Sequence, residues 1–377
     1  MFALQEMLQE AIERKASDIH LSSSKPPILR IDGDLEFQPL PPLVPEDVLK
    51  ALEGISSHEQ QADFEKKGDA DFSFDFGGKM RFRVNAFQTV DGPAMVMRLI
   101  PANPPNLQQI GAPPVMKQMA RLKKGLVLVT GPTGSGKSTT LAALIDYIND
   151  ISHSHVLTIE DPIEYIHKSR KALINQREVG RHSGSFHSAL RGALREDPNV
   201  ILVGEMRDLE TISLALTAAE TGHLVLATLH TSSAAKAVDR IIDVFSANEK
   251  ALVRTMVAGS LQAVVAQTLL RKIGGGRVAA FEVLVANQAV RNLIRENKIF
   301  QMESMIQLGA KHGMQSMKES VQELVVAGKV SVEEADDLLH EIEAEKNATD
   351  EGGGVGGSRA AALHGHHPAS GIPQHHQ

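Results

Sequence analysis

The sequence predicts an α/β protein in which a small N-terminal α+β domain precedes a larger domain built on a parallel sheet. Strand-like and helix-like runs alternate over residues 115–346, as in a parallel sheet covered on both faces. Residues 71–76 and 80–87 alternate at period two around a pair of glycines, which predicts an antiparallel hairpin. A glycine-rich run, residues 131–138, separates a predicted strand from a predicted helix, as a phosphate-binding loop does.

Composition narrows the class of protein. With 377 residues the chain exceeds the usual size of one core, so two or three domains are expected. The formal net charge of −7, with 4% aromatic residues and no tryptophan, argues against a direct nucleic-acid partner. Because the chain has no cysteine, disulfides, cysteine-bound zinc and a thiol nucleophile are excluded.

Membrane and export signals are not found in the sequence. No apolar run approaches the roughly 20 residues that a helix needs to cross a bilayer, so no transmembrane segment is expected. The first residues lack the basic start and the continuous apolar stretch of a signal peptide. Both observations indicate a cytoplasmic location.

Two changes in composition divide the chain. The proline-rich segment 101–114 lacks regular-structure signals and is interpreted as a linker, which leaves an N-terminal domain over residues 1–100. After about residue 346, glycine and histidine dominate, so residues 347–377 are predicted to be a disordered tail. The domain between these changes, residues 115–346, is expected to end in helices over about residues 287–346.

The glycine-rich run has the composition and the setting of a P-loop. It follows an apolar run, residues 125–130, and opens a helix-like run, residues 139–145. Glycines allow a curl whose backbone N–H groups form an anion site at the helix N-terminus. Lys137 is expected to contact the β- and γ-phosphates, and the Ser138 hydroxyl to bind Mg²⁺. Nucleotide contacts are expected from Gly131, Thr133, Gly134, Ser135, Gly136, Lys137, Ser138 and Thr139.

Acidic or polar residues follow three further apolar runs. The runs are residues 156–160, 199–205 and 223–230, and each ends in residues that a buried strand would not need. Ligands of open α/β sheets lie beyond the carboxyl ends of the strands. We therefore expect one site that contains Glu160, Asp161, Glu164, Glu205 and His230.

Phosphoryl-transfer chemistry suggests a role for each of these acids. ATP hydrolysis requires a held Mg²⁺, a positioned water and positive charge at the transition state. Glu205 is expected to hold the metal, because Gly204 stands where a metal-binding Asp is usual. Glu164 or Glu160 then orients and deprotonates the water, and His230 completes the expected catalytic set. A nucleotide switch without hydrolysis is the alternative, but it would not need these carboxylates.

Four motifs in order resemble those of the type IV pilus retraction ATPases of the PilT type, within the secretion ATPase superfamily. They are the P-loop, the acidic box 158–165, the segment 195–208 around Glu205 and the histidine box 221–231. The resemblance covers residues 1 to about 345. Pilus assembly and type II secretion ATPases also share the motor core, but they typically carry a long N-terminal extension and a four-cysteine element.

One further segment favours retraction over assembly. Residues 289–296 closely resemble the motif specific to retraction ATPases, with Val290 where Ile is usual. The accessory retraction ATPases resemble this segment less. An alternative interpretation is that its apolar residues, Val290, Leu293 and Ile294, only pack the helix onto the domain.

The resemblance also implies an architecture and partners. It implies a PAS-like N-terminal domain and a RecA-like P-loop domain, assembled as a homohexamer with ATP between the two domains. Arg83 and Arg98 are then expected to contact phosphate, whereas the alternative for a hairpin arginine is a solvent-exposed face. The expected partner is an inner-membrane pilus platform protein, which places the chain peripherally at the inner-membrane base of the pilus. Motility and DNA-uptake roles are not distinguished.

Overall fold

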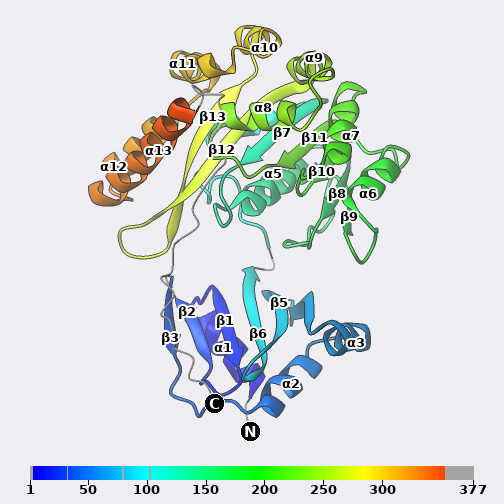
Figure 1. Cartoon of the computed structure of the whole chain (residues 1–377), viewed down its shortest axis with the longest axis vertical. Helices are drawn as coiled ribbons and strands as arrows, with labels where there is room; N and C mark the ends of the chain where they lie inside the picture. Colours follow the sequence, from blue (N-terminus) through cyan, green and yellow to red (C-terminus); the bar gives the residue numbers. More distant parts are fainter. Residues whose placement is uncertain (1–2, 32, 79, 102, 353–377) are drawn as a thin grey trace, which may run out of the picture.

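The computed structural model describes residues 3–31, 33–78, 80–101 and 103–352. Figure 1 shows two bodies, each organised around its own sheet, and they are called here the N-terminal part and the P-loop part. The first sheet is antiparallel and the second is mostly parallel, so the predicted fold class is confirmed. No helix in the described ranges is long and apolar enough to span a membrane.

The N-terminal part is a six-stranded antiparallel sheet in the order β3-β2-β1-β6-β5-β4. One face is apolar and buries residues of alternating position, such as Phe82, Val84 and Ala86, under three helices. The opposite face carries the polar residues between them. The elements are α1 (Leu4–Glu13), β1 (Asp18–Ser22), β2 (Ile28–Ile31), β3 (Asp34–Phe37), α2 (Pro45–Glu53), α3 (His58–Lys67), β4 (Asp69–Phe76), β5 (Met80–Thr89) and β6 (Gly92–Pro101).

The predicted hairpin is confirmed as β4 and β5. Gly77 and Gly78 have φ angles of 64° and 67°, which side chains rarely adopt, so the tight turn requires glycine there. Residues that face each other across the ladder include Phe74 and Phe82, whose rings stack at 5.1 Å. The turn and the aromatic pair fix the register of the edge strand β4.

The P-loop part contains a seven-stranded sheet in the order β13-β12-β7-β11-β10-β8-β9. All neighbours are parallel except β12 and β13, which form an antiparallel hairpin. The predicted run 199–205 is a shorter strand, so Glu205 lies two residues beyond its end. The strands are β7 (Gly125–Thr130), β8 (His155–Glu160), β9 (Leu173–Glu178), β10 (Val200–Val203), β11 (Leu224–Thr228), β12 (Leu261–Arg271) and β13 (Arg277–Val285).

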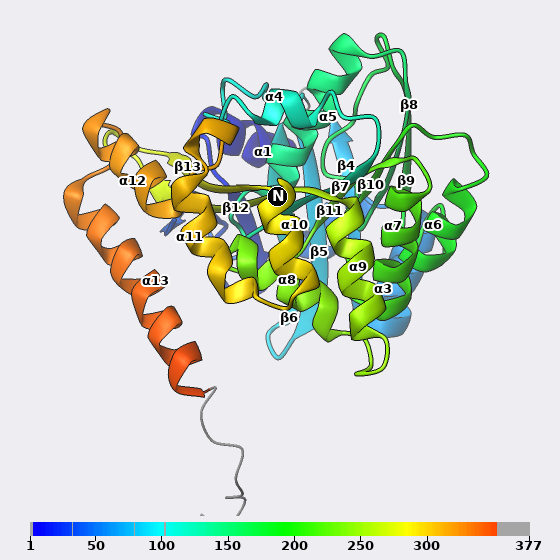
Figure 2. The same ribbon diagram turned by 90° about the horizontal axis from the view of Figure 1, so that it is seen from above.

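Helices cover both faces of this sheet (Figures 1 and 2). Alternate residues of β7 mark the two layers: Leu126 and Leu128 join one apolar cluster, and Val127 and Val129 join the other. The first cluster includes α6, α7, α8, α9 and α10, and the second includes α4 and α5. Their bounds are α4 (Met116–Met119), α5 (Lys137–Ile151), α6 (Phe186–Ala193), α7 (Leu209–Glu220), α8 (Ala234–Asp243), α9 (Lys250–Ser260) and α10 (Gln288–Arg295).

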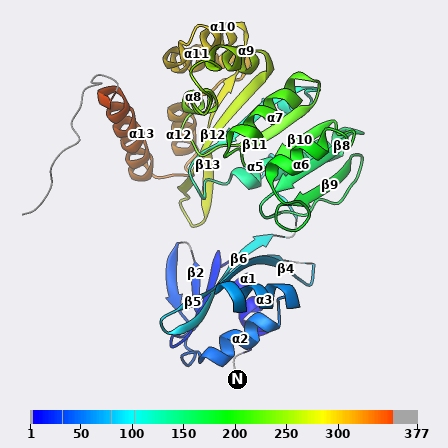
Figure 3. The same cartoon turned by 45° about the vertical axis from the view of Figure 1, so that its right-hand side comes forward.

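The chain ends in further helices. The long last helix packs its first half against α12 and then extends from the body (Figures 2 and 3). It continues to Gly352, beyond the predicted end of the helical part at residue 346. The rest of the predicted disordered tail, residues 353–377, lies outside the described residues. The elements are η1 (Ile299–Gln301), α11 (Met302–Leu308), η2 (Ala310–His312), α12 (Met317–Val326) and α13 (Val332–Gly352).

The connection between the two sheets contains no further strand in its described residues. β6 ends at Pro101, and the segment from residue 103 to α4 forms turns; the linker over residues 101–114 stays a prediction. Leu107 of this segment is buried in the core around α4 and α5. The connection is therefore packed onto the P-loop part over at least part of its length.

Candidate active site

The P-loop lies between β7 and α5, where the sequence predicts it. Gly131, Gly134 and Gly136 have φ angles of 145°, 80° and 87°, so the loop uses backbone conformations that favour glycine. A Cβ at Gly131 would lie only 2.2 Å from the carbonyl oxygen of Gln267 on β12. The loop is therefore curled tightly against β12, and its last glycine directly precedes α5. This arrangement presents backbone N–H groups at a helix N-terminus, the geometry that binds phosphate.

Lys137 points back onto its own loop. Its Nζ donates to the carbonyl oxygens of Gly131 at 2.8 Å and Pro132 at 2.9 Å, and lies 3.5 Å from Nδ1 of His230. Burial lowers the pKa of Lys137, although the charges of Glu205 and Glu164 oppose the shift. The structure thus brings four of the predicted site residues to one end of the sheet.

Glu205 is held in a short network at the end of β10. Its Oε1 accepts from Nε of Arg207 at 2.6 Å and lies 3.0 Å from Nε2 of His230. Burial alone would raise the pKa of Glu205, but the hydrogen bond from Arg207 and the charge of His230 outweigh it, so the pKa falls below its usual value. Glu205 is therefore a carboxylate at neutral pH, as a metal ligand must be.

The residue before Glu205 explains the departure from the usual acidic strand end. A Cβ at Gly204 would lie 3.0 Å from the carbonyl oxygen of Ile159 and 3.2 Å from the Cα of Glu160. β8 and β10 approach so closely here that an aspartate would push them apart. The acidic side chain at this end of β10 therefore stands at position 205 and not at position 204.

The residues present fit Mg²⁺ bound through a nucleotide. No group of three His, Asp or Glu side chains that could hold a metal occurs among the described residues. Mg²⁺ in nucleotide sites takes only one or two protein ligands and completes its shell with phosphate oxygens and water. Ser138 and Glu205 suffice as that minimal set.

The two candidate bases occupy different environments. Glu160 accepts hydrogen bonds from Thr158 Oγ1 at 2.7 Å and from Gln176 Nε2 at 3.3 Å. Burial raises its pKa to about 7, and the charge of Glu164 adds to the shift. Glu164 itself acts through its charge on Lys137 and on Arg83. Glu164 therefore lies within electrostatic range of these two cations, whereas Glu160 accepts hydrogen bonds from Thr158 and Gln176.

A small cavity with both polar and apolar lining residues lies beneath α5. Its volume is about 30 Å³, enough for a single water. Tyr165 at its wall pairs with Thr139 through their hydroxyl groups at 3.1 Å. The cavity connects the acidic box to the predicted metal ligand Ser138. It is lined by Ser138, Leu141, Ala142, Glu160, Tyr165, His167, Leu202, Gly204 and Thr228.

The two predicted N-terminal arginines differ in their surroundings. Arg83 pairs with Asp71 at 2.8 Å, and this hydrogen bond, together with the charges of Asp71, Glu164 and Asp161, raises its pKa above the ordinary value. Arg98 donates from Nε to Asp18 at 2.9 Å. The structure therefore brings Arg83 within electrostatic range of the acidic box. For Arg98, the described interactions lie within the N-terminal part.

Gln267 supports the P-loop and was missed by sequence reasoning. Its Nε2 donates to the carbonyl oxygen of Ser135 at 2.6 Å, and its side chain is fully enclosed. A second hydrogen bond joins the end of β7 to the segment after β11: Thr130 Oγ1 donates to the carbonyl oxygen of Thr231 at 2.7 Å. A polar residue within the apolar run of β12 was the available signal for Gln267.

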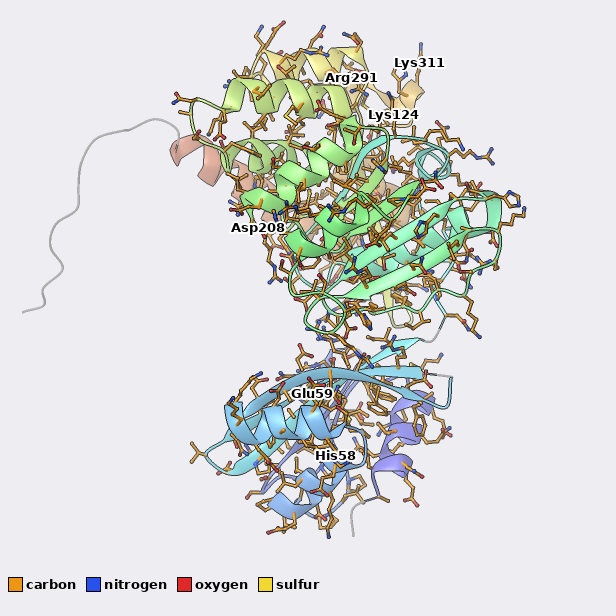
Figure 4. All side chains as sticks on the ribbon, turned by 90° about the vertical axis from the view of Figure 1, so that its right-hand side faces the viewer. His58, Glu59, Lys124, Asp208, Arg291 and Lys311 are labelled. Atoms are coloured by element: carbon orange, nitrogen blue, oxygen red, sulfur yellow. The ribbon has the colours of Figure 1, made fainter. Side chains whose placement is uncertain are left out.

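The segment 289–296 forms α10, and most of its apolar residues are packing residues. Val290 and Ile294 are fully buried, and Leu293 is partly buried against the same core. Arg291 donates to the carbonyl oxygens of Ala258 and Gly259 at the end of α9, at 2.5 and 2.9 Å. Figure 4 shows Arg291 at the end of the P-loop part remote from the N-terminal sheet. The segment is therefore distant from the nucleotide loop.

Many known proteins match this chain in sequence or in structure. Residues 2–337 match the family described as Type II/IV secretion system protein. The chain is 54% identical over 330 residues to the type IV pilus retraction ATPase PilT of Pseudomonas aeruginosa PAO1, covering 88% of this chain and 96% of that protein. It is 37% identical over 332 residues to the type IV pilus ATPase PilU of the same organism, covering 88% and 87%.

A solved structure agrees with the sequence matches. The crystal structure of the pilus retraction motor PilT with bound ADP is 48% identical to this chain and gives a TM-score of 0.81. The match covers 89% of this chain and 96% of that one, and so includes both sheets. The chain is a member of the Type II/IV secretion system protein family.

Proposed function

We propose that this chain is a motor ATPase that hydrolyses ATP to retract type IV pili. The observation that carries the proposal is the joint occurrence of a P-loop and nearby carboxylates in a chain 54% identical to PilT over almost its whole length. A retraction motor requires both nucleotide binding and hydrolysis, and the site supplies residues for each.

Nucleotide binding is assigned to the P-loop residues. The backbone curl from Gly131 to Gly136 cradles the phosphates, and Lys137 exchanges its loop carbonyls for the β- and γ-phosphate oxygens. Ser138 and Glu205 would hold Mg²⁺, which when bound would neutralise charge on the transferring phosphoryl group. His230, placed between Lys137 and Glu205, orients both side chains. The remaining loop residues, Thr133, Gly134, Ser135 and Thr139, complete the cradle.

Glu164 is the better candidate for the base that activates water. Thr158 and Gln176 both donate to Oε1 of Glu160, so this oxygen is already committed to hydrogen bonds. Glu164 lies among the cationic groups that act on the phosphates, and its charge is felt by Lys137 and Arg83. A base in that position lies beside the γ-phosphoryl group and can hold the attacking water.

The motor output follows from closure of the two parts around ATP. Arg83 stabilises the charge that develops on the γ-phosphoryl group. Arg98 contacts the same group when the N-terminal sheet moves toward the P-loop part. In a homohexamer, closure and release in successive subunits would turn a platform protein in the inner membrane and extract pilin subunits. This places the chain in the cytoplasm, bound peripherally at the base of the pilus.

Assembly and secretion ATPases of the same family are the second candidate, and an accessory retraction ATPase is the third. The absence of cysteine and the α10 segment argue against the assembly class. The higher identity to PilT than to PilU argues against the accessory class.

Complementation tests the proposal directly. A piliated bacterium that lacks its retraction ATPase should regain twitching when it expresses this chain. The variant Leu293→Ala should bind ATP normally and fail to restore twitching, because the partly buried Leu293 connects α10 to the body of the domain. Full twitching with Leu293→Ala would contradict the proposal that α10 is required for retraction. Failure of the wild-type chain, when it is expressed and folded, would contradict retraction.

A further inference from the structure

The face of the N-terminal sheet opposite its helices carries a row of charges at one level. The backbone register places Arg30 beside Asp18, Asp18 beside Arg98, and Arg98 beside Arg83 on successive strands. Like charges directly opposite each other destabilise a sheet unless each is compensated. Arg98 and Arg83 are cross-strand neighbours, and each forms an ion pair with a carboxylate on the strand at its other side.

The side chains of these two arginines turn in opposite directions. Arg98 turns toward the buried carboxylate of Asp18, with Nε and Oδ1 2.9 Å apart. Arg83 turns the other way, toward Asp71 on the edge strand β4, and uses both Nε and a terminal nitrogen at 3.4 and 2.8 Å. The Arg83–Asp71 pair is partly exposed, with side-chain exposures of 35% and 45%, so it is held weakly.

The same guanidinium is attracted by the acidic box of the P-loop part. The charges of Glu164 and Asp161 act on Arg83 in addition to that of Asp71. Arg83 is thus positioned at the boundary between its own sheet and the nucleotide site. An anion that takes the edge of the guanidinium formed by Nε and the terminal nitrogen would compete with Asp71, because both hydrogen bonds to Asp71 use that edge.

We propose that Asp71 is a positioning residue that competes with the γ-phosphate for Arg83. Asp71 retains the guanidinium on the N-terminal sheet until ATP takes it over, and recovers it after phosphate leaves. The inference rests on the proposed function, in which Arg83 contacts phosphate. It predicts that Asp71 lowers the affinity for ATP while it speeds the release that follows hydrolysis.

The chain offers a closely matched control. Asp69 lies two residues earlier on the same face of β4, and its partner is the neutral Asn85, at 3.1 Å. Asp69→Asn therefore removes the same charge from the same strand without freeing an arginine. Asp71→Glu keeps the charge and serves as the conservative variant.

The test measures ATP affinity by titration calorimetry and turnover by phosphate release on the full chain. Asp71→Asn is expected to tighten ATP binding about two- to five-fold, the range of an exposed ion pair, and to lower KM with kcat unchanged or reduced. Asp69→Asn should leave the affinity unchanged, and Asp71→Glu should restore it. In an Arg83→Gln background, Asp71→Asn should have no further effect.

Three other outcomes would each contradict a stated part of the account. Equal affinities for Asp71→Asn and Asp69→Asn, with a loss of affinity in Arg83→Gln, would overturn the competition while Arg83 keeps its role. An unchanged affinity in Arg83→Gln would overturn both residue roles. The expected affinity pattern without turnover in any variant would support the competition and contradict the proposed motor.

Discussion

At the residue scale, two carboxylates four residues apart, Glu160 at the end of β8 and Glu164 in the segment after it, have different surroundings. Glu160 is half-buried, accepts two side-chain hydrogen bonds on Oε1, and has its pKa raised to about 7 by desolvation. Glu164 lies near the cationic groups of the site. Sequence reasoning left both as candidate bases, because spacing alone does not report burial. The same limit applies to Arg83 and Arg98, whose carboxylate partners are set by strand register.

Glu160→Gln tests the burial of this carboxyl. In the folded chain its pKa is about 7, above the value of about 4.3 in an unfolded chain, so the folded state retains a proton that the unfolded state has lost. Stability therefore falls as pH rises from about 4.5 through 7. The neutral amide escapes this cost, so Glu160→Gln should have a higher Tm than wild type at pH 8 and a much smaller difference in Tm at pH 5. Equal Tm values at both pH values would contradict the raised pKa.

At the element scale, most strands and the hairpin could be predicted because their signals are local. Period-two alternation identified β4 and β5, and apolar runs that end in acidic or polar residues identified β8 and β11. The support of the P-loop by Gln267 could not be predicted, because 132 residues separate it from Ser135. The end of β10 was also missed by two residues, since strand ends are set by pairing with neighbours.

The tie between α10 and α9 gives a stability prediction. Arg291 donates to two carbonyl oxygens at the α9 C-terminus and to Gln262 Oε1 on β12, where orphan carbonyls favour a cation. Arg291→Met should lower the free energy of unfolding by about 1.5–3 kcal/mol, the range for hydrogen bonds to charged groups. Arg295→Met on the same helix is the control, because Arg295 is exposed and bonds only within α10 in the described structure. Urea unfolding with equal losses in both variants would contradict the tie.

At the scale of the whole molecule, two sheets present complementary charge to one another. The N-terminal sheet offers a row of arginines opposite its helices, and the P-loop sheet offers carboxylates at its carboxyl edge. The sequence predicts both sheets and the P-loop residues. It does not predict which arginine lies within range of the acidic box, because that depends on contacts between segments about 80 residues apart.

The most direct test measures Mg²⁺-dependent ATP hydrolysis per subunit against protein concentration, for the wild type and for Glu164→Gln. Turnover that rises as the chain assembles and vanishes in Glu164→Gln is the predicted result, since the proposal assigns water activation to Glu164 in a ring of subunits. ATP binding in the variant should persist, which separates loss of the base from loss of the site. Tight ATP binding by the wild type without turnover at any concentration would contradict the account.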